Sequence, residues 1–454
     1  MNMKTKTPAI FIGILFLTGC QNLKEVDTTV YMDPSRPVEE RVEALLEQMT
    51  LEEKIGQMDM VSEWDQDSIM KAGYYDFGAW IAGQEPEAAN LLQSFSEKTR
   101  LKIPYLIGMD AAHGYATLQG RTIYPTSVSM AATFNRSLTE QAARKAAAEI
   151  RSAGTHWTFA PCVDIVCDAR WGRTGETYGE DPFLASEMVR TAVKGLQDNP
   201  DPAKRVAASV KHLAAGGVSA GGVNHASAEI SERFLRSYIL PPFKAAVEAG
   251  CMTIMPGHND IGGIPCHASR WLLTDVVKGE FGFGGFFISD MMDMDNLTSL
   301  HFTAENQSQA LEKSINAGMD MHMYSPDSLQ FAVPVRQLVR EGKIPVSRID
   351  DAVRRILKVK FSLGLFENRY TDPAADRYAT PDSRRTALEA ARECVVLLKN
   401  EGESPAAGHH EIPADPRDRP QCGQPGHPGR LVVHPAGQLC GDRARGNAQD
   451  GGRH

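Results

Sequence analysis

The sequence lacks basic character, because its 48 Lys and Arg residues are outnumbered by 57 Asp and Glu residues, for a formal net charge of −9. Nucleic-acid binding needs a basic surface that neutralises phosphates, so this balance excludes nucleic acid as a partner. No G-x-G-x-x-G or P-loop pattern is present, which argues against a nucleotide-binding fold. The 8 cysteines and 13 histidines show no C-x-x-C or H-x-x-x-H spacing. We therefore expect no metal site and no cofactor.

Long apolar segments are also scarce, and the one near the N-terminus is too short to span a bilayer. It runs from Ala9 to Leu17, follows two lysines, and leads through Leu-Thr-Gly into Cys20. This order predicts a secretory signal over residues 1–20. Its end resembles the bacterial lipobox, whose cysteine is lipid-modified; an ordinary signal with an incidental cysteine is the alternative. Because Gln21 follows Cys20, we expect an exported protein, periplasm-facing or at the cell surface, held on the outer membrane by its lipid anchor alone.

Residues 402–454 lack aromatic side chains and lysine altogether, while they contain 10 Gly and 7 Pro. Such a segment cannot bury enough apolar surface to offset the entropy of ordering, so we expect it to be disordered. The change in composition is abrupt, which favours an out-of-frame tail in place of a second domain. A natural disordered tail is the alternative.

The remaining cysteines leave the disulfide pattern open. Export permits disulfide bonds. Cys162 with Cys167, and Cys251 with Cys266, are near enough in sequence to pair across loops. Free buried thiols are the alternative.

Residues 21–370 alternate short apolar runs with helical patterns. Thr50 and Ser137 each begin a capping-box pattern, Ser347 is expected to open a third helix, and Gly364 to close it. Strands that are apolar over their whole length are typical of a buried parallel sheet. The alternation favours a (β/α)8 barrel of the TIM type over a doubly wound sheet. The expected strands are Tyr105–Gly108, Trp157–Ala160, Ala207–Val210, Thr253–Met255 and Phe286–Ile288.

Polar residues follow these strands directly, and in a parallel barrel the carboxyl ends of the strands meet at one rim. An aspartate there is often only a helix cap, and Arg173 could be tied to Glu176 or Glu180 instead. As a set, charged donors and acceptors suit a neutral ligand rich in hydroxyl groups. The residues expected to converge are Asp110, Arg173, Lys211, His212, His258 and Asp290.

Several segments together resemble glycoside hydrolase family 3, of the bacterial β-glucosidase type. They are Gly108–Gly114, Arg170–Arg173, Glu176–Pro182, Ser209–His212, Gly263–Ala268, Trp271–Leu273 and Ile288–Asp290. The resemblance implies that Asp290 is the nucleophile. It also implies that Asp110, Arg173, Lys211 and His212 hold the sugar hydroxyls. Two substrate-binding positions depart from the family pattern, because His258 stands where many members have Tyr and Met291 where many have Trp.

The resemblance further implies a retaining, exo-acting β-glucosidase that acts on β-glucosides or oligosaccharides through a covalent glycosyl-Asp290 intermediate. In most members a glutamate from a second, α/β-sandwich domain is the acid/base. Here residues 371–401 resemble only a linker and the first elements of that domain, so we expect impaired activity. His225 is a weak substitute. The alternatives are a β-xylosidase, an N-acetylglucosaminidase, or a sugar-binding lipoprotein without catalysis.

Overall fold

The computed structural model describes residues 25–399, apart from short gaps at 63–65, 68, 70–72, 74, 325–328 and 376–377. The predicted signal segment with Cys20 and the predicted tail at 402–454 lie outside the described residues. The chain divides into a compact unit that ends at Val396 and a second unit from Leu397 to His454. Within the described part of the chain, no helix combines the length and apolarity needed to cross a membrane.

The centre of the first unit is a parallel sheet of eight strands in the order β10-β1-β2-β3-β4-β5-β6-β9. A parallel bridge between Ile288 and Met321 joins the two end strands. Ser289 N donates to Met321 O at 3.0 Å, and Met321 N donates to Phe287 O at 2.9 Å. The sheet therefore closes on itself, which confirms the predicted (β/α)8 barrel.

All five expected strands are present as β3, β4, β5, β6 and β9. Three more were not expected, and each is short or carries polar residues such as Asp59 and His322. The strands are β1 (Asp59–Ser62), β2 (Ala79–Ile81), β3 (Leu106–Met109), β4 (Trp157–Thr158), β5 (Ala207–Leu213), β6 (Thr253–Pro256), β9 (Phe286–Phe287) and β10 (His322–Met323). A small antiparallel pair, β7 (Asp260–Ile261) and β8 (Ile264–Pro265), lies outside the barrel sheet.

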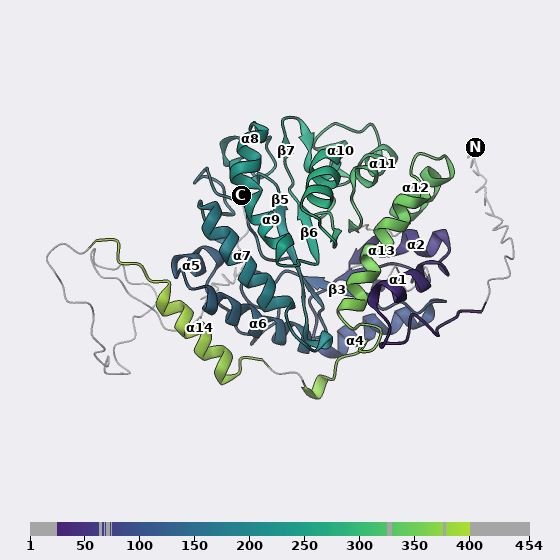
Figure 1. Cartoon of the computed structure of the whole chain (residues 1–454), viewed down its shortest axis with the longest axis horizontal. Coiled ribbons are helices and arrows are strands. Elements are labelled where there is room, and N and C mark those ends of the chain that lie inside the picture. The colour runs from purple at the N-terminus through teal and green to yellow at the C-terminus, as the bar shows by residue number, and fades with distance from the viewer. Residues whose placement is uncertain are drawn as a thin grey trace, which may run out of the picture. The chain divides into compact units, whose positions relative to one another are not determined.

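Helices surround the strands in Figure 1. On one side α6 packs against α7 and α7 against α9, while α13 packs against α1 and α2 on the other. The helices are α1 (Val38–Leu46), α2 (Leu51–Gln57), α4 (Pro86–Ser94), α5 (Ser127–Ala132), α6 (Arg136–Ser152), α7 (Pro182–Gln197), α8 (Glu232–Phe234), α9 (Pro241–Glu248), α10 (Asn296–Ser299), α11 (Gln307–Ala317), α12 (Leu329–Arg340), α13 (Val346–Ser362) and α14 (Pro381–Glu393). Two π-helical segments, Leu235–Ile239 and Trp271–Glu280, follow α8 and β8.

The helix ends test the capping predictions. The capping box of Thr50 and Glu53 is confirmed, with both reciprocal hydrogen bonds formed. The prediction for Ser137 was wrong, because α6 begins two residues earlier and the side chain of Asn135 accepts from Leu138 N. Helix α13 begins at Val346 after Pro345, so Ser347 is not its cap. Gly364, with φ of 66°, follows the C-cap of α13 as expected.

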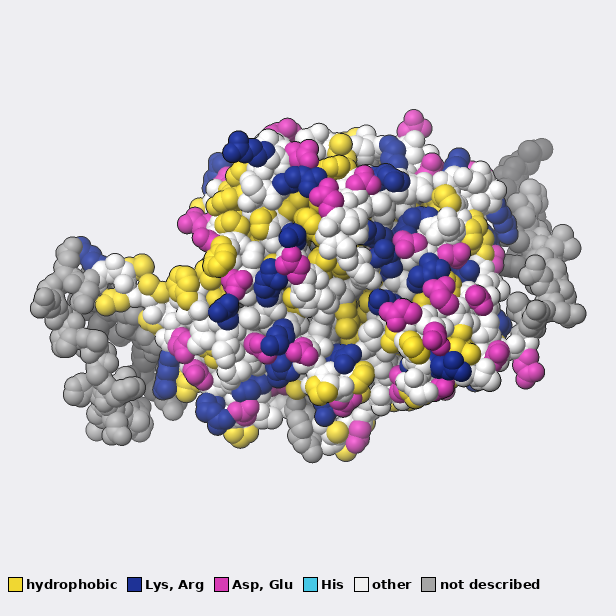
Figure 2. Space-filling view, in the orientation of Figure 1, with side chains coloured by type: hydrophobic (Ala, Val, Ile, Leu, Met, Phe, Trp, Pro, Cys, Tyr) yellow, Lys and Arg dark blue, Asp and Glu magenta, His cyan; other side chains and the backbone are white. Residues whose placement is uncertain are grey.

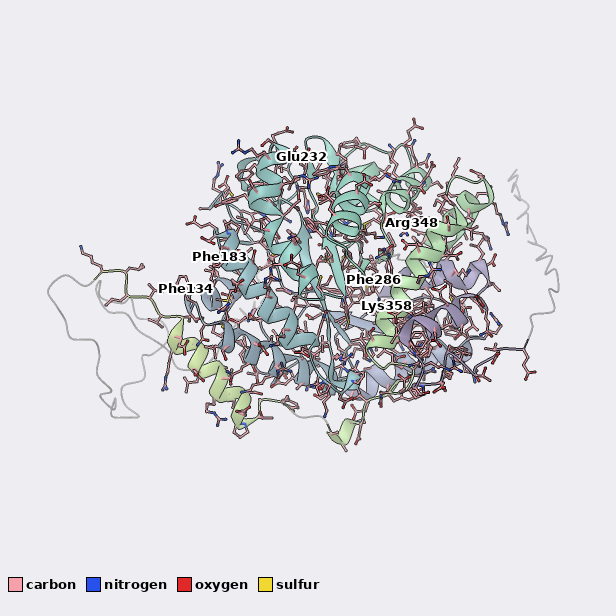
Figure 3. All side chains as sticks on the ribbon, in the orientation of Figure 1. Phe134, Phe183, Glu232, Phe286, Arg348 and Lys358 are labelled. Carbon is pink, nitrogen blue, oxygen red and sulfur yellow. The ribbon has the colours of Figure 1, made fainter. Side chains whose placement is uncertain are left out.

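The core is aromatic and aliphatic, and the outer face mixes charges. Figure 3 shows Phe286 among the strands, where it is fully buried, while Phe134 and Phe183 stand outward beside α5 and α7. On the face shown in Figure 2, basic and acidic side chains are interspersed rather than gathered by sign.

Helix α14 follows the barrel and contacts α6. Ala390 is fully buried, and Lys145 of α6 contacts both Thr386 and Asp382. The division of the chain into residues 21–370, 371–401 and 402–454 stays a prediction.

The cysteines in the described residues are free. They are Cys162, Cys167, Cys251, Cys266 and Cys394. Neither of the two possible disulfides forms, so the alternative of free thiols holds for these residues.

Candidate active site

Strand β5 brings two basic side chains to the rim of the barrel. All seven of its residues are buried, Lys211 and His212 included. An unpaired charge in such a strand would be costly. Lys211 offsets this cost by donating from Nζ to Oδ1 of Asp110 at 2.6 Å. Asp110 follows β3, and its side chain is more than half exposed. The structure therefore joins two of the predicted sugar-binding residues in one ion pair that faces solvent on the Asp110 side.

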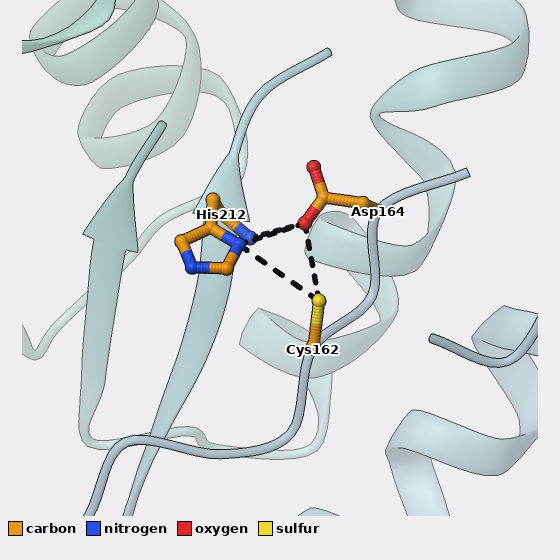
Figure 4. A group of neighbouring side chains, drawn as sticks. All are labelled: Cys162, Asp164 and His212. Atoms are coloured by element: carbon orange, nitrogen blue, oxygen red, sulfur yellow. Dashed lines mark hydrogen bonds and ion pairs between the residues drawn. The ribbon is translucent and has the colours of Figure 1, made fainter. Parts of the chain in front are cut away.

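His212 is fixed from behind by a buried group (Figure 4). Asp164 Oδ2 accepts from both the backbone N and Nδ1 of His212, each at 2.9 Å, and from Sγ of Cys162 at 3.2 Å. Burial lowers the pKa of His212 despite the opposing attraction of Asp164. Burial acts to raise the pKa of Asp164, but the bonds from His212 outweigh it and leave that pKa below its usual value. Asp164 was not among the predicted site residues, although it follows β4.

Asp290 lies directly beyond β9, with two imidazoles against its carboxylate. Oδ2 is 3.1 Å from Nε2 of His258 and 3.7 Å from Nε2 of His212. Oδ1 accepts from Met291 N at 2.7 Å. Asp290 does not cap a helix, since α10 begins only at Asn296. The simple capping interpretation is therefore wrong for this residue.

A buried carboxylate also holds the ring of His258. Its Nδ1 lies 2.8 Å from Oδ2 of Asp293, a side chain that is 2 % exposed. Burial acts to lower the pKa of His258, but Asp293 and then Asp290 outweigh burial and raise that pKa above its usual value. Burial acts to raise the pKa of Asp293, and the nearby His267 and His258 reverse this, so that the pKa is well below its usual value. Asp293, three residues after Asp290, was also missed.

Arg173 has two partners, one structural and one in the site. Its guanidinium makes two bonds to Glu176, at 2.8 and 2.9 Å, and Nη1 lies 3.4 Å from Nε2 of His258. The predicted tie to Glu176 is therefore present, and the same side chain still reaches the neighbours of Asp290. Burial acts to lower the pKa of Arg173, but Glu176 raises it, so the group stays charged.

The other candidates lie at the edge of this group. The ring of His225 is 4.7 Å from that of His258 between centroids. Met291 is 38 % exposed and leaves an apolar surface beside the carboxylate. One of the barrel-end loops contains a G-x-S-x-G spacing at residues 217–221. There Ser219 Oγ donates to Gly216 O at 2.8 Å between two short 3-10 turns, which is not the strand-to-helix elbow of a serine hydrolase.

Comparisons with known proteins identify the family of the barrel. The model of the glycosyl hydrolase family 3 N-terminal domain matches residues 50–359. The chain belongs to glycoside hydrolase family 3. It is 32 % identical to a β-xylosidase of Formosa agariphila over 86 % of this chain and 51 % of that protein. It is 34 % identical to a periplasmic β-glucosidase of Salmonella typhimurium over 79 % of this chain and 48 % of that protein.

The fold is also similar to that of a solved β-glucosidase structure from Erythrobacter marinus. The TM-score is 0.77 at 33 % identity, over 82 % of this chain and 52 % of that one. The chain thus spans about half the length of the relatives it matches. Family membership and the barrel are established by these matches.

Proposed function

We propose that this chain is the barrel part of a retaining, exo-acting β-glucosidase in which Asp290 is the nucleophile. The observation that carries the proposal is the position of the Asp290 carboxylate, 3.1 Å from His258 and 3.7 Å from His212 at the rim of the barrel. Asp290 is 18 % exposed, so a ligand can reach it. The family 3 relatives named as β-glucosidase support the sugar class.

The chemistry proceeds by double displacement. An oxygen of Asp290 bonds to the anomeric carbon while the bond to the leaving oxygen breaks, and the leaving oxygen takes a proton. Water then replaces Asp290 and gives up a proton, which restores the sugar with its original anomeric configuration. The ion pair of Lys211 with Asp110, together with Arg173, offers charged groups that hold the hydroxyls of a terminal glucosyl residue.

This mechanism needs a proton donor for the leaving oxygen, and the carboxylates around Asp290 do not suit that role. The described carboxylates nearest Asp290 are engaged by basic partners: Asp164 with His212, Asp293 with His258, and Glu176 with Arg173. Their pKa values are lowered, after burial is outweighed, which is the wrong direction for a general acid. We therefore propose that this chain acts best on aryl glucosides whose leaving group needs no proton. Loss of general acid assistance costs about 10²–10⁴-fold on ordinary glucosides.

Covalent trapping tests the proposal. Incubation with 2-deoxy-2-fluoro-β-glucosyl fluoride should add one fluoroglucosyl group to the peptide that contains Asp290. The Asp290→Asn variant should stay unlabelled, and Asp260→Asn, a change in the small β7–β8 pair, should label like the wild type. An unlabelled wild-type protein that still binds glucose would favour a sugar-binding role instead. A cellobiose turnover equal to that of the aryl glucoside would contradict the missing proton donor.

A second candidate activity, β-xylosidase, is favoured by the relative from Formosa agariphila. Xylose lacks the hydroxymethyl group of glucose, so nitrophenyl β-xyloside and β-glucoside separate the two by their kcat/KM ratio. A nitrophenyl N-acetylglucosaminide belongs in the same panel.

We also propose export and a lipid anchor at Cys20, supported by the lipobox-like sequence and by the periplasmic relative. Metabolic labelling with a fatty acid should mark the wild-type chain and not Cys20→Ser. Equal labelling of the two would refute the anchor.

A further inference from the structure

The two histidines beside Asp290 share an arrangement that sugar binding alone does not require. In each, one ring nitrogen is held by a buried carboxylate: Nδ1 of His212 by Asp164 and Nδ1 of His258 by Asp293. Both carboxylates are at most 2 % exposed. A carboxylate behind a ring nitrogen fixes the tautomer and leaves the lone pair on the other nitrogen, as in metal-binding histidines.

The free nitrogens of these rings point toward one carboxylate oxygen. Nε2 of His212 is buried and has no hydrogen-bond partner among the described residues. Nε2 of His258 accepts from Arg173 at 3.4 Å when the ring is neutral, because a guanidinium only donates. Both Nε2 atoms face Oδ2 of Asp290, at 3.7 and 3.1 Å. Nε2 of His212 thus has a lone pair beside an anionic oxygen, and Nε2 of His258 has one when its ring gives up its proton to the entering ion.

These distances fit a small divalent cation. Ligands bound to zinc at 2.0–2.1 Å in a tetrahedral arrangement are separated by about 3.3 Å. The two distances to Asp290 lie on either side of that value, and all three ligand atoms lie within 4.8 Å of one another. The third pair, formed by the two Nε2 atoms, lies within the same 4.8 Å. The exposed sides of Asp290 and His258 leave room for a fourth ligand such as water.

The local charge also favours a cation. Lys211 is paired with Asp110, and Arg173 with Glu176, so these four charges cancel. The carboxylates that remain are Asp290, Asp164 and Asp293. These three negative charges beside the two imidazoles attract a divalent ion at short range.

We propose that His212, His258 and Asp290 bind a divalent transition-metal ion, of which Zn²⁺ is the fitting example, and that this ion inhibits the protein by occupying the carboxylate of the nucleophile. The inhibitory part rests on the proposed function; the metal site does not. Two imidazoles and one carboxylate are a common zinc donor set. An Asp290 oxygen bound to the metal has no free lone pair in the direction of the anomeric carbon.

A neighbouring group, Cys162, Asp164 and His212, is an alternative position for the ion (Figure 4). Its ligand atoms already satisfy one another, because Asp164 Oδ2 accepts from both other side chains. We therefore assign the ion to the set with Asp290.

The experiment measures metal binding directly and uses the full chain. Isothermal titration with ZnCl2 is compared for the wild type, His258→Gln, His258→Tyr and Asp290→Asn, with circular dichroism as the check on folding. Five of the 13 histidines lie at 402–454, so binding is read as the difference between the variants and the wild type. His113→Gln is the matched control, since Nδ1 of His113 bonds to Tyr124 O and the residue is outside the set.

We expect one Zn²⁺ equivalent to be lost, or weakened at least about 100-fold, in the His258 and Asp290 variants and kept in His113→Gln. Asp293 holds His258 and does not itself bind the ion, so Asp293→Asn should weaken Zn²⁺ binding by about 10–100-fold. Binding unchanged in both folded His258 variants overturns the proposal. Co²⁺ gives a second readout: a near-ultraviolet thiolate band that disappears in Cys162→Ser assigns the ion to the alternative group and also overturns it.

Covalent trapping separates this proposal from the proposed function. A fluoroglucosyl group on Asp290 should abolish the Zn²⁺ equivalent. Trapping without any Zn²⁺ binding would refute only the metal site. Zn²⁺ binding in a chain that cannot be trapped would refute only the glycosidase activity.

Discussion

The pair of His258 and Asp293 predicts how the stability of this barrel depends on pH. The pKa of His258 is raised, so its contribution to stability is complete below the unfolded value of about 6.5 and is lost as the pH rises through the folded pKa. The pKa of Asp293 is lowered, so its contribution is present above about pH 3.9 and is lost as the pH falls through the folded pKa. The pair therefore stabilises the fold most between about pH 4 and 6.5.

Asp293→Asn removes the negative charge and keeps the shape of the side chain. At pH 5.5 this leaves a protonated, 15 % exposed His258 without its partner, which costs about 3 kcal/mol. At pH 8.5 a smaller fraction of the imidazole is protonated, and the loss falls toward about 1 kcal/mol. With an unfolding entropy of about 2.1 cal/mol/K per residue, the roughly 360 described residues give a Tm change of about 4 °C at pH 5.5 and about 1 °C at pH 8.5.

Thermal melting of the wild type and Asp293→Asn at both pH values measures these differences. Glu53→Gln is the matched control, because Glu53 is a part-buried carboxylate paired with Arg100, which stays charged throughout. Its loss of Tm should be the same at both pH values. A loss in Asp293→Asn that is equally independent of pH would refute the argument and leave Asp293 a packing group only.

Three further predictions concern other parts of the barrel. Lys211→Met should lower kcat/KM on nitrophenyl glucoside by about 10²–10³-fold, because Asp110 and the sugar lose a buried cation; a value within twofold of the wild type would contradict that role. Gly78→Ala should destabilise the fold by about 3 kcal/mol or more, since its Cβ would lie 2.1 Å from Gln57 O, while Gly175→Ala, with open space around it, should melt like the wild type. Of the cysteines in the barrel, exposed Cys167 should react fastest with a thiol reagent in the native state, and Cys167→Ser should remove that phase, whereas rapid reaction of buried Cys251 would contradict the structure.

The fold was largely predictable because buried parallel strands have a strong signal. Phe286–Ile288 is apolar throughout and Ala207–Val210 is apolar apart from Ser209, and each became part of a strand of the barrel. Strand β10 gave no such signal, since it is two residues long and includes His322. That imidazole is buried, and its bonds to Asp295 and Asp59 outweigh burial and raise its pKa to about 9. A strand built on an ion pair cannot be found from apolar runs.

The residues that meet at the site could be predicted from the sequence, but the hydrogen bonds that hold them could not. The strand ends indicated which polar residues meet, and the contacts of Asp290 with His212 and His258 agree with that expectation. The carboxylates behind the histidines were not predicted. Asp164 and Asp293 act through burial and through distances of 2.9 and 2.8 Å, and neither quantity can be read from sequence spacing.

These hidden carboxylates decide what the imidazoles next to Asp290 can do. A histidine with both nitrogens free can rotate and exchange tautomers, whereas His258 is held so that Nε2 faces Asp290. A tyrosine at this position, as the resemblance implies for many family members, would have to lose its phenolic proton, with a pKa near 10, before it could bind a metal ion. The imidazole of His258 has to lose a proton of much lower pKa than a phenol to offer a lone pair to the ion. The identity of residue 258 therefore determines whether divalent metal ions bind beside the nucleophile and inhibit it.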